Sequence, residues 1–467
     1  MNYLRAELPV HVPSGLMYPP PQKAMNPLDR KFVGIQPMGS SDIASVVDGT
    51  IVRFRFPAQG FLDCGKTMLR FGLNVVQNPT GNPFLESAGA ASIIKRLVIR
   101  CNGQEIEDIQ NYSDIHRWIQ LTHAQDHLDY ATAVMQGTEG NIVETEAITA
   151  GSRRYRAVPQ GAKLTTSSNP AVPEPHNPGG GLTVGATAVA SNTRWFLIPF
   201  LASGLLGPAN NQYLPLWAMG NDFEVEITLY GPAGTYKDSQ TVGALATQAN
   251  VAPTGTLTLT GLRLEVQYVD VPDAYTKALL EKFKSAQAIY MNFSSWQSFN
   301  QVCQGATDII NIQHILSNAE AIFLGRKATT ITAANGGMFQ YHGGDFQSSQ
   351  LQVGAKYYPS QPITTRTDLF YSLLEAVGRL NNTIDPVRIP FVNWGVDGSA
   401  TTEAETLYAY NLRKYRQSGV LTGIPLEGSC SLTNTYTRSP NIASTNLIGI
   451  KHTRVLVLTA EGITILK

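Results

Sequence analysis

Alternation of apolar and polar residues is the feature that most constrains this chain, and it recurs in short stretches along the length. In IVRFRF at residues 51–56, apolar side chains alternate with two arginines, and FEVEITLY at 223–230 repeats the pattern with two glutamates. A period of two residues places successive side chains on opposite faces of a β-strand. Each stretch therefore predicts a half-buried strand of an antiparallel sheet.

An Asn-Gly pair at residues 102–103 separates two further apolar runs. Both residues tolerate the positive φ that a two-residue type I′ turn requires, so the pair predicts a β-hairpin. In that hairpin Ile99 would face Ile106 on the apolar side. Arg100 would face Glu105 on the wet side, as an ion pair across the two strands.

The hairpin is followed by NYSDIHRWIQL, whose apolar residues fall at helical spacing around Trp118, with Ser113 in the position of an N-cap. His116, His123 and His127 could share one face of this helix, a spacing that also suits metal ligands. The stretch HAQDH lacks the glutamate that a zinc protease needs as its general base. A solvated or capping histidine face is therefore favoured over a metal site.

The strand pattern stops at Pro272 and starts again after the helical stretch PDAYTKALLEKFKSAQ. In the second half a helix is expected where Leu369, Leu373 and Val377 recur at i, i+4 and i+8. Each half has many short strands, few helices and long connections, which is typical of a β-sandwich. A chain of 467 residues is long for one core, so two consecutive sandwiches are expected.

The charge balance argues against a protein that neutralises nucleic acid or an acidic membrane, because 35 basic residues equal 35 acidic ones. Charged residues make up only 15% of the chain, against about 25% in an average soluble domain. Such a composition suits a surface that is largely covered by neighbours. Cys64, Cys101, Cys303 and Cys430 form no CxxC pair, so buried reduced thiols are expected.

No motif in the chain predicts catalysis. Glu224 and Glu226 share one face of a single strand, where a solvated face is favoured over the paired acids of a glycosidase. The Gly-rich stretch at 335–346 lacks the Lys-Ser/Thr of a phosphate-binding loop, so a surface loop is expected. The clusters SRRYR at 152–156 and LRKYRQ at 412–417 could stack on nucleic acid, but subunit contacts are favoured. We predict no catalytic, cofactor-binding or metal-binding residue, and a protein that is not an enzyme.

Residues 1–29 are rich in proline and aperiodic, which predicts an extended N-terminal arm. The start of the chain has no basic region followed by an apolar core, so synthesis in a cytosol-like compartment is expected.

Several stretches together resemble the double jelly-roll major capsid proteins of tailless icosahedral double-stranded DNA viruses. The hairpin resembles the family's strand, Gly-Gly-Gln, apolar, acidic pattern, with Asn102 in place of the first glycine and with Tyr112 and Trp118 after it. Four other stretches resemble later elements of the family: 194–229, with its Leu-Pro-Leu step; 262–283, which joins the two halves; PLEGSCSLTN at 425–434; and the closing strands at 447–467. Departures in the first and fourth of these leave open the subfamily, such as polinton-like viruses, virophages or nucleocytoplasmic large DNA viruses.

The resemblance implies an all-β fold of two consecutive eight-stranded jelly rolls with a few short helices in the connections. It places an arm at 1–29, the first jelly roll at 30–272, a linking helix at 273–285 and the second jelly roll at 286–467.

The resemblance also implies a capsid protein, synthesised in the host cytoplasm or a virus factory, whose homotrimers tile an icosahedral shell in the virion. Its partners would be neighbouring capsomers, penton and minor capsid proteins and an internal membrane, with no specific nucleic-acid contact and no cofactor. Loops such as 159–193 and 328–347 would face outward or clasp neighbours. A viral spike or carbohydrate-binding β-sandwich protein is the alternative, and a sandwich enzyme acting on glycans is a third hypothesis.

Overall fold

The computed structural model describes residues 29–76, 82–86, 88–122, 135–136, 141–146, 154–158, 193–239, 250–251, 255–271, 273–285, 288–329, 338–344, 346–380, 387, 389, 394–395, 405–414, 422–426, 428–436, 444–459 and 462–466. The predicted arm therefore lies outside the described residues except for its last position, and the 159–193 loop lies outside them except for Thr193. Among the described residues, no helix is both long and apolar enough to cross a membrane.

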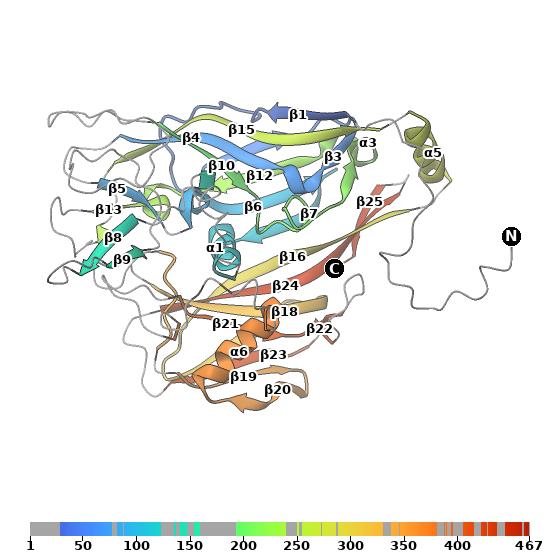
Figure 1. Cartoon of the computed structure of the whole chain (residues 1–467). Coiled ribbons are helices and arrows are strands. Elements are labelled where there is room, and N and C mark those ends of the chain that lie inside the picture. The colour runs from blue at the N-terminus through green and yellow to red at the C-terminus, as the bar shows by residue number, and fades with distance from the viewer. Residues whose placement is uncertain are drawn as a thin grey trace, which may run out of the picture.

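The first half of the chain forms two sheets whose buried side chains belong to one apolar core, and we call this pair the first sandwich (Figure 1). The β15 sheet contains β1 (Asp29–Ile35), β3 (Phe61–Asp63), β4 (Met68–Val76), β10 (Arg194–Pro199), β11 (Tyr213–Pro215) and β15 (Thr256–Asp270). The β12 sheet has the order β2 (Ile51–Arg55), β12 (Glu224–Leu229), β6 (Ile94–Cys101) and β7 (Gln104–Gln110). As expected, β2 buries Val52 and Phe54 and exposes Arg53 and Arg55.

Shorter elements complete the first half. A small sheet joins β5 (Asn82–Leu85), β13 (Tyr236–Ser239) and β14 (Asn250–Val251), and a ribbon joins β8 (Asn141–Glu146) to β9 (Arg154–Val158). The short helices are η3 (Cys64–Lys66), η4 (Gly89–Ile93), α3 (Leu216–Met219), η5 (Gly220–Asp222) and α4 (Pro232–Thr235). The longer helix α1 (Tyr112–Thr122) follows the β6–β7 hairpin.

The second half forms two more sheets, which we call the second sandwich (Figure 1). The β24 sheet contains β16 (Ile289–Val302), β18 (Leu316–Ala328), β21 (Leu407–Asn411), β22 (Ile424–Leu426), β24 (Ser444–Thr459) and β25 (Gly462–Leu466). The β23 sheet has the order β17 (Thr307–Ile312), β23 (Cys430–Tyr436), β19 (Phe346–Val353) and β20 (Lys356–Ile363). The all-β expectation is thus confirmed.

The two expected helices of the linker and the second half are present. Helix α5 (Asp273–Lys284) lies between the last strand of the first sandwich and the first strand of the second. Helix α6 (Arg366–Val377) buries Leu369 and Leu373, as the spacing predicted. Its N-terminus is capped by Thr365, whose hydroxyl oxygen accepts a hydrogen bond from the Asp368 amide at 3.0 Å. The domain boundaries at 272 and 286 stay a prediction.

The strands of both sandwiches run along one long axis (Figure 1). One end, the linker end, carries the start of β1, helix α5 and the β24–β25 hairpin. At the opposite end, the loop end, Val76 pairs with Thr256 in the first sandwich and Ala328 pairs with Ser444 in the second. The two ends of the molecule therefore differ in which connections they carry.

The hairpin has the predicted turn but not all of the predicted register. Asn102 and Gly103 have φ of 49° and 75°, and Arg100 pairs with Glu105. A β-bulge then places Glu107, rather than Ile106, opposite Ile99. The extra residue lets β7 bury Ile106 and Glu107 in succession, which a strand of regular alternation could not do on one face.

The expected N-cap at Ser113 is wrong, because helix α1 already begins at Tyr112 and Ser113 is buried in its first turn. The residue before the helix is Asn111, with a φ of 50°. Its carbonyl oxygen accepts hydrogen bonds from the amides of Asp114 and Ile115 at 3.1 and 3.2 Å.

Candidate functional site at the junction of the two sandwiches

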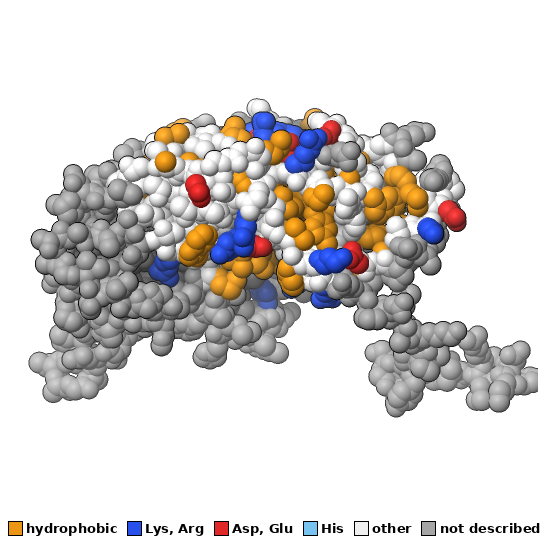
Figure 2. Space-filling view, turned by 90° about the horizontal axis from the view of Figure 1, so that it is seen from above, with side chains coloured by type: hydrophobic (Ala, Val, Ile, Leu, Met, Phe, Trp, Pro, Cys, Tyr) orange, Lys and Arg blue, Asp and Glu red, His pale blue; other side chains and the backbone are white. Residues whose placement is uncertain are grey.

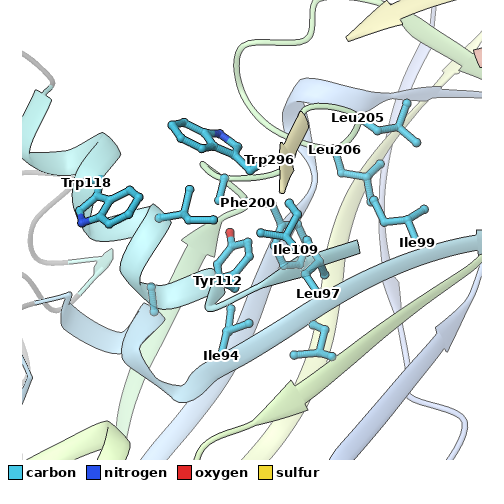
Figure 3. Close-up of a cluster of buried hydrophobic side chains, with 14 of the residues drawn as sticks. Ile94, Leu97, Ile99, Ile109, Tyr112, Trp118, Phe200, Leu205, Leu206 and Trp296 are labelled. Carbon is cyan, nitrogen blue, oxygen red and sulfur yellow. The ribbon is translucent and has the colours of Figure 1, made fainter. Parts of the chain in front are cut away.

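Helix α1 lies between the two sandwiches (Figure 1). Tyr112 at its start packs toward the first sandwich, with its ring centroid 6.4 Å from that of Phe200. Figure 3 shows Tyr112 among the first-sandwich side chains and Trp118, one and a half turns later, on the other side of the cluster. Because ten of the eleven helix residues are buried, both sides of α1 are covered.

Trp118 is the apolar centre of the junction and is only 1% exposed. Its ring stacks on Phe323 of β18 at 6.4 Å and meets the edge of Tyr341 at 6.0 Å. Beneath it lie two glycines of adjacent strands: a Cβ on Gly449 would lie 2.6 Å from the indole, and one on Gly325 would lie 3.0 Å from it. Glycine is therefore required at both positions by the close approach of the tryptophan.

Two ion pairs flank Trp118 and join the sandwiches. Arg117 of α1 donates to Glu405 at 3.1 Å, with side chains 2% and 7% exposed. Lys327 of β18 donates to Asp114 at 2.6 Å, and the Tyr341 hydroxyl donates to the same carboxylate at 3.0 Å. Because buried ions are stable only when fully partnered, these pairs favour one relative placement of the sandwiches.

Glu107 of β7 forms a third polar link and is fully buried. It accepts hydrogen bonds from the Ser203 hydroxyl at 2.6 Å, the Gly204 amide at 2.8 Å and, across the junction, the Ser295 hydroxyl at 2.8 Å. Burial raises the pKa of Glu107, although these donors and the charge of Arg454 oppose that shift. Arg454 of β24 is also buried and donates to a main-chain carbonyl of β7 at 2.6 Å.

The backbones also approach closely beside this link. A Cβ on Gly204 would lie 1.8 Å from the carbonyl oxygen of Ser294 in β16. The loop after β10 can therefore lie against β16 only with glycine at this position. The junction thus combines a stacked tryptophan, buried charges and close backbone contact, and it can hold the two sandwiches as one body.

The histidines expected on a solvated face are only partly within the described residues. His116 is fully buried, with its ring centroid 5.8 Å from that of Tyr112, so the expectation is wrong for it. The cause is that both sandwiches cover α1. His123 and His127 lie outside the described residues. In the described part of the chain, no group of three or more His, Cys, Asp or Glu could hold a metal ion.

Glu224 and Glu226 lie on the outer face of the β12 sheet, as expected, but they are ion-paired. Arg53 of β2 lies 3.5 Å from Glu224 and 2.9 Å from Glu226, and Arg100 of β6 lies 2.9 Å from Glu226. Glu226 is only 5% exposed, so the expectation of a solvated carboxylate is wrong there. Their role in the described structure is to link three strands.

The Gly-rich stretch is not a surface loop where it is described. Phe339, Tyr341 and His342 are buried, because this segment packs beside Trp118 and the Glu405 strand. In the second basic cluster, Arg413 forms an ion pair with Glu320 inside the chain. Residues 415–417 of that cluster, and residues 152–153 of the first, lie outside the described residues.

The cysteines are free, as expected. Burial raises the pKa of the Cys64 thiol to about 12 and those of Cys101 and Cys430 to about 11. Cys303 is half-buried, so it departs from the expectation of full burial. The three buried thiols are held in their unreactive form.

Sequence reasoning missed the junction as a site. Two signals were present, namely Gly325 inside the apolar run AIFLG and Gly449 inside LIGI. A glycine within a strand marks a bulge or the close approach of another group. Nothing in the sequence indicates that Trp118 is the group that approaches.

Comparison with known proteins places this geometry in a fold. No protein-family model matches the chain, and no curated protein matches it. Three solved structures match over nearly all of it. A chain of the PBCV-1 virus capsid has a TM-score of 0.57 at 12% identity, covering 96% of this chain and 99% of that one. The mavirus major capsid protein has a TM-score of 0.54 at 12% identity, with 98% and 95% covered. A chain of the Sputnik virophage has a TM-score of 0.57 at 11% identity, with 98% and 92% covered.

At these identities the likeness establishes the fold. The chain is a double jelly-roll protein: each sandwich is a jelly roll, and the few helices lie in the connections. The predicted fold class is confirmed.

Proposed function

We propose that this chain is the major capsid protein of an icosahedral double-stranded DNA virus. The observation that carries the proposal is the match of nearly the entire chain to capsid chains, with both sandwiches included. A match to one sandwich alone would suit many unrelated functions, because the jelly roll is a fold with many uses. The structural role of the mavirus protein fits a chain that is not an enzyme.

The junction supports assembly as a homotrimer. Two similar sandwiches fixed side by side present two similar units per chain, so three chains around a threefold axis give six units in a ring. Such a pseudo-hexagonal capsomer can tile a shell. A junction that let the sandwiches move independently would not fix that outline, whereas buried ion pairs and the Trp118 stack hold it.

The proposal assigns the loop end to the outside of the shell and the linker end to the inside. β10 begins at Arg194, opposite Leu73, and β18 ends at Ala328, so the segments 159–193 and 328–347 both join strands at the loop end. The N-terminal arm begins at the linker end, where it would reach neighbouring capsomers, minor capsid or penton proteins, or an internal membrane.

Native mass tests the proposal. Purified at micromolar concentration, the chain is expected to form a stable trimer of about three times its 50.7 kDa, which electron microscopy would show as a hexagonal particle. A persistent monomer would count against a capsomer. The alternative of a spike or carbohydrate-binding protein has less support, because the solved structures that match the whole chain come from capsids.

Deletion of residues 1–29 tests the arm separately. Trimers are expected to survive the deletion, because the described sandwiches and their junction lie outside the arm. Assembly of trimers into shells is expected to weaken. Shells that form as readily from the shortened chain as from the full chain would rule out the proposed role of the arm.

A further inference from the structure

The outer face of the β23 sheet carries no charged residue in its three strands β17, β23 and β19. Its outward positions include Ile309 and Asn311 of β17, Thr433 and Thr435 of β23, and Gln350 and Gln352 of β19. The other three outward positions of these strands are serine or threonine. The alternate residues Ile310, Leu432 and Leu351 are fully buried, which fixes this face as the outer one.

These side chains form a regular grid. Thr433 lies at its centre, between Ile309 on one side and Gln350 on the other. The same pairing repeats in the row above and the row below, so the face is a nearly flat patch of three rows. The strands of this sheet lie on the side of the molecule farthest from the first sandwich (Figure 1).

The other sheets present different outer faces. The β15 sheet exposes Arg70, Arg263 and Glu265, which Figure 2 shows as clustered charges among apolar patches on the upper face. The β12 sheet carries the ion pairs of Arg53 and Arg100. The β24 sheet is covered by α1. Among the four large sheets as described, the β23 sheet is therefore the one whose open face can lose its water without stripping an ion.

We propose that this face pairs with the same face of a second copy across a twofold axis near Thr433. This inference rests on the proposed function. Serine, threonine, asparagine and glutamine side chains each donate and accept hydrogen bonds, so the face is complementary to itself. Two copies of a face that carries charge of one sign would repel each other, and this face avoids that cost. An axis at the centre of the grid lets the largest number of its side chains find partners.

The symmetry decides which contact this is. A threefold ring contains no twofold axis in the plane between its own neighbours, so a face that pairs with itself must join chains of different trimers. The β23 sheet is thus the contact between capsomers, and the contacts within a trimer use other surfaces.

Charge placed at the centre of the grid tests the proposal. With Thr433→Lys, trimers are expected to keep their mass, while the protein concentration needed for shell assembly rises about tenfold or more, because two lysines meet at the axis. Thr433→Glu is expected to behave in the same way. An equal mixture of the two variants is expected to assemble near the wild-type concentration, because lysine then meets glutamate.

Thr258→Lys serves as the matched control, since Thr258 is a half-buried, outward threonine of a central strand in the β15 sheet. Its assembly concentration is expected to stay within about twofold of the wild type. If Thr433→Lys does not fold, the pair Gln350→Lys and Gln350→Glu, next to it on the same face, replaces it with the same expected outcomes.

The outcomes separate this inference from the proposed function. A wild-type chain that never forms trimers overturns both. If wild-type shells form and Thr433→Lys assembles at the same concentration, this inference alone is wrong. Loss of the trimer in Thr433→Lys would place the face inside the capsomer, and weak assembly without rescue by mixing would show that the face meets a different surface. Either result overturns the twofold pairing.

Discussion

Replacement of Trp118 by alanine should remove most of the apolar adhesion between the two sandwiches. Truncation of a buried tryptophan or phenylalanine to alanine costs about 3–5 kcal/mol in free energy of unfolding. The cost here should lie near the upper limit, because Gly325 and Gly449 have no side chains that could fill the space. The lost ring contacts with Phe323 and Tyr341 add to it, at about 0.5–1.5 kcal/mol for each aromatic pair.

Urea unfolding gives the size of the loss, and hydrogen exchange gives its place. In Trp118→Ala, amides of α1, β18 and β24 should exchange faster, whereas those of β4 and β15, which lie away from the junction, should keep their protection. Trp195→Ala is the matched control. Trp195 is 48% exposed and its main partner is Arg70, 4.4 Å from its ring, so the loss should be about 1 kcal/mol or less.

Two results would refute this reasoning. If Trp118→Ala loses no more stability than Trp195→Ala, the tryptophan is not the apolar centre of the junction. If the added exchange appears equally in β4 and β15, Trp118 supports the first sandwich as a whole rather than its contact with the second.

The other predictions concern packing, pH and thiol chemistry. Gly449→Ala should cost about 1–3 kcal/mol, and much less in a Trp118→Ala background, because the clashing ring is gone; equal costs in a double-mutant cycle would contradict this. The raised pKa of Glu107 means that the folded state holds its proton more tightly than the unfolded state, so the stability of the wild type relative to Glu107→Gln should fall as pH rises above about 4.3; thermal unfolding curves that stay parallel across pH would disprove it. Alkylation of the native protein, followed by mass spectrometry, should modify Cys303 before the three buried thiols; earlier reaction at Cys64 would be evidence against its burial.

Much of the fold could be predicted because it is set by local rules. Alternation over two residues determined strands such as β2 and β12, and Asn102 with Gly103 determined a type I′ turn. Spacing over 3.6 residues, with Thr365 before it, determined α6. Each of these signals lies within about ten residues of chain, so it can be read without knowledge of distant partners.

The candidate site could not be predicted in the same way. Asp114 and Lys327 are 213 residues apart in the chain, and Arg117 and Glu405 are 288 apart. A charged residue in a helix looks the same in sequence whether it meets water or a distant carboxylate. The bulge at Ile106 is a further example, since only the contacts of Glu107 with Ser203 and Ser295 explain it.

The sequence by itself therefore determined an all-β chain of two sandwiches with α5 between them, because period and turn chemistry act over a few residues. The tertiary structure alone decided how the sandwiches meet. Trp118 could be recognised as a buried aromatic of a helix, but the surface that buries it consists of two glycines whose importance lies in the absence of a side chain. Close packing between distant segments depends on the shapes of both partners, and one segment does not encode the shape of the other.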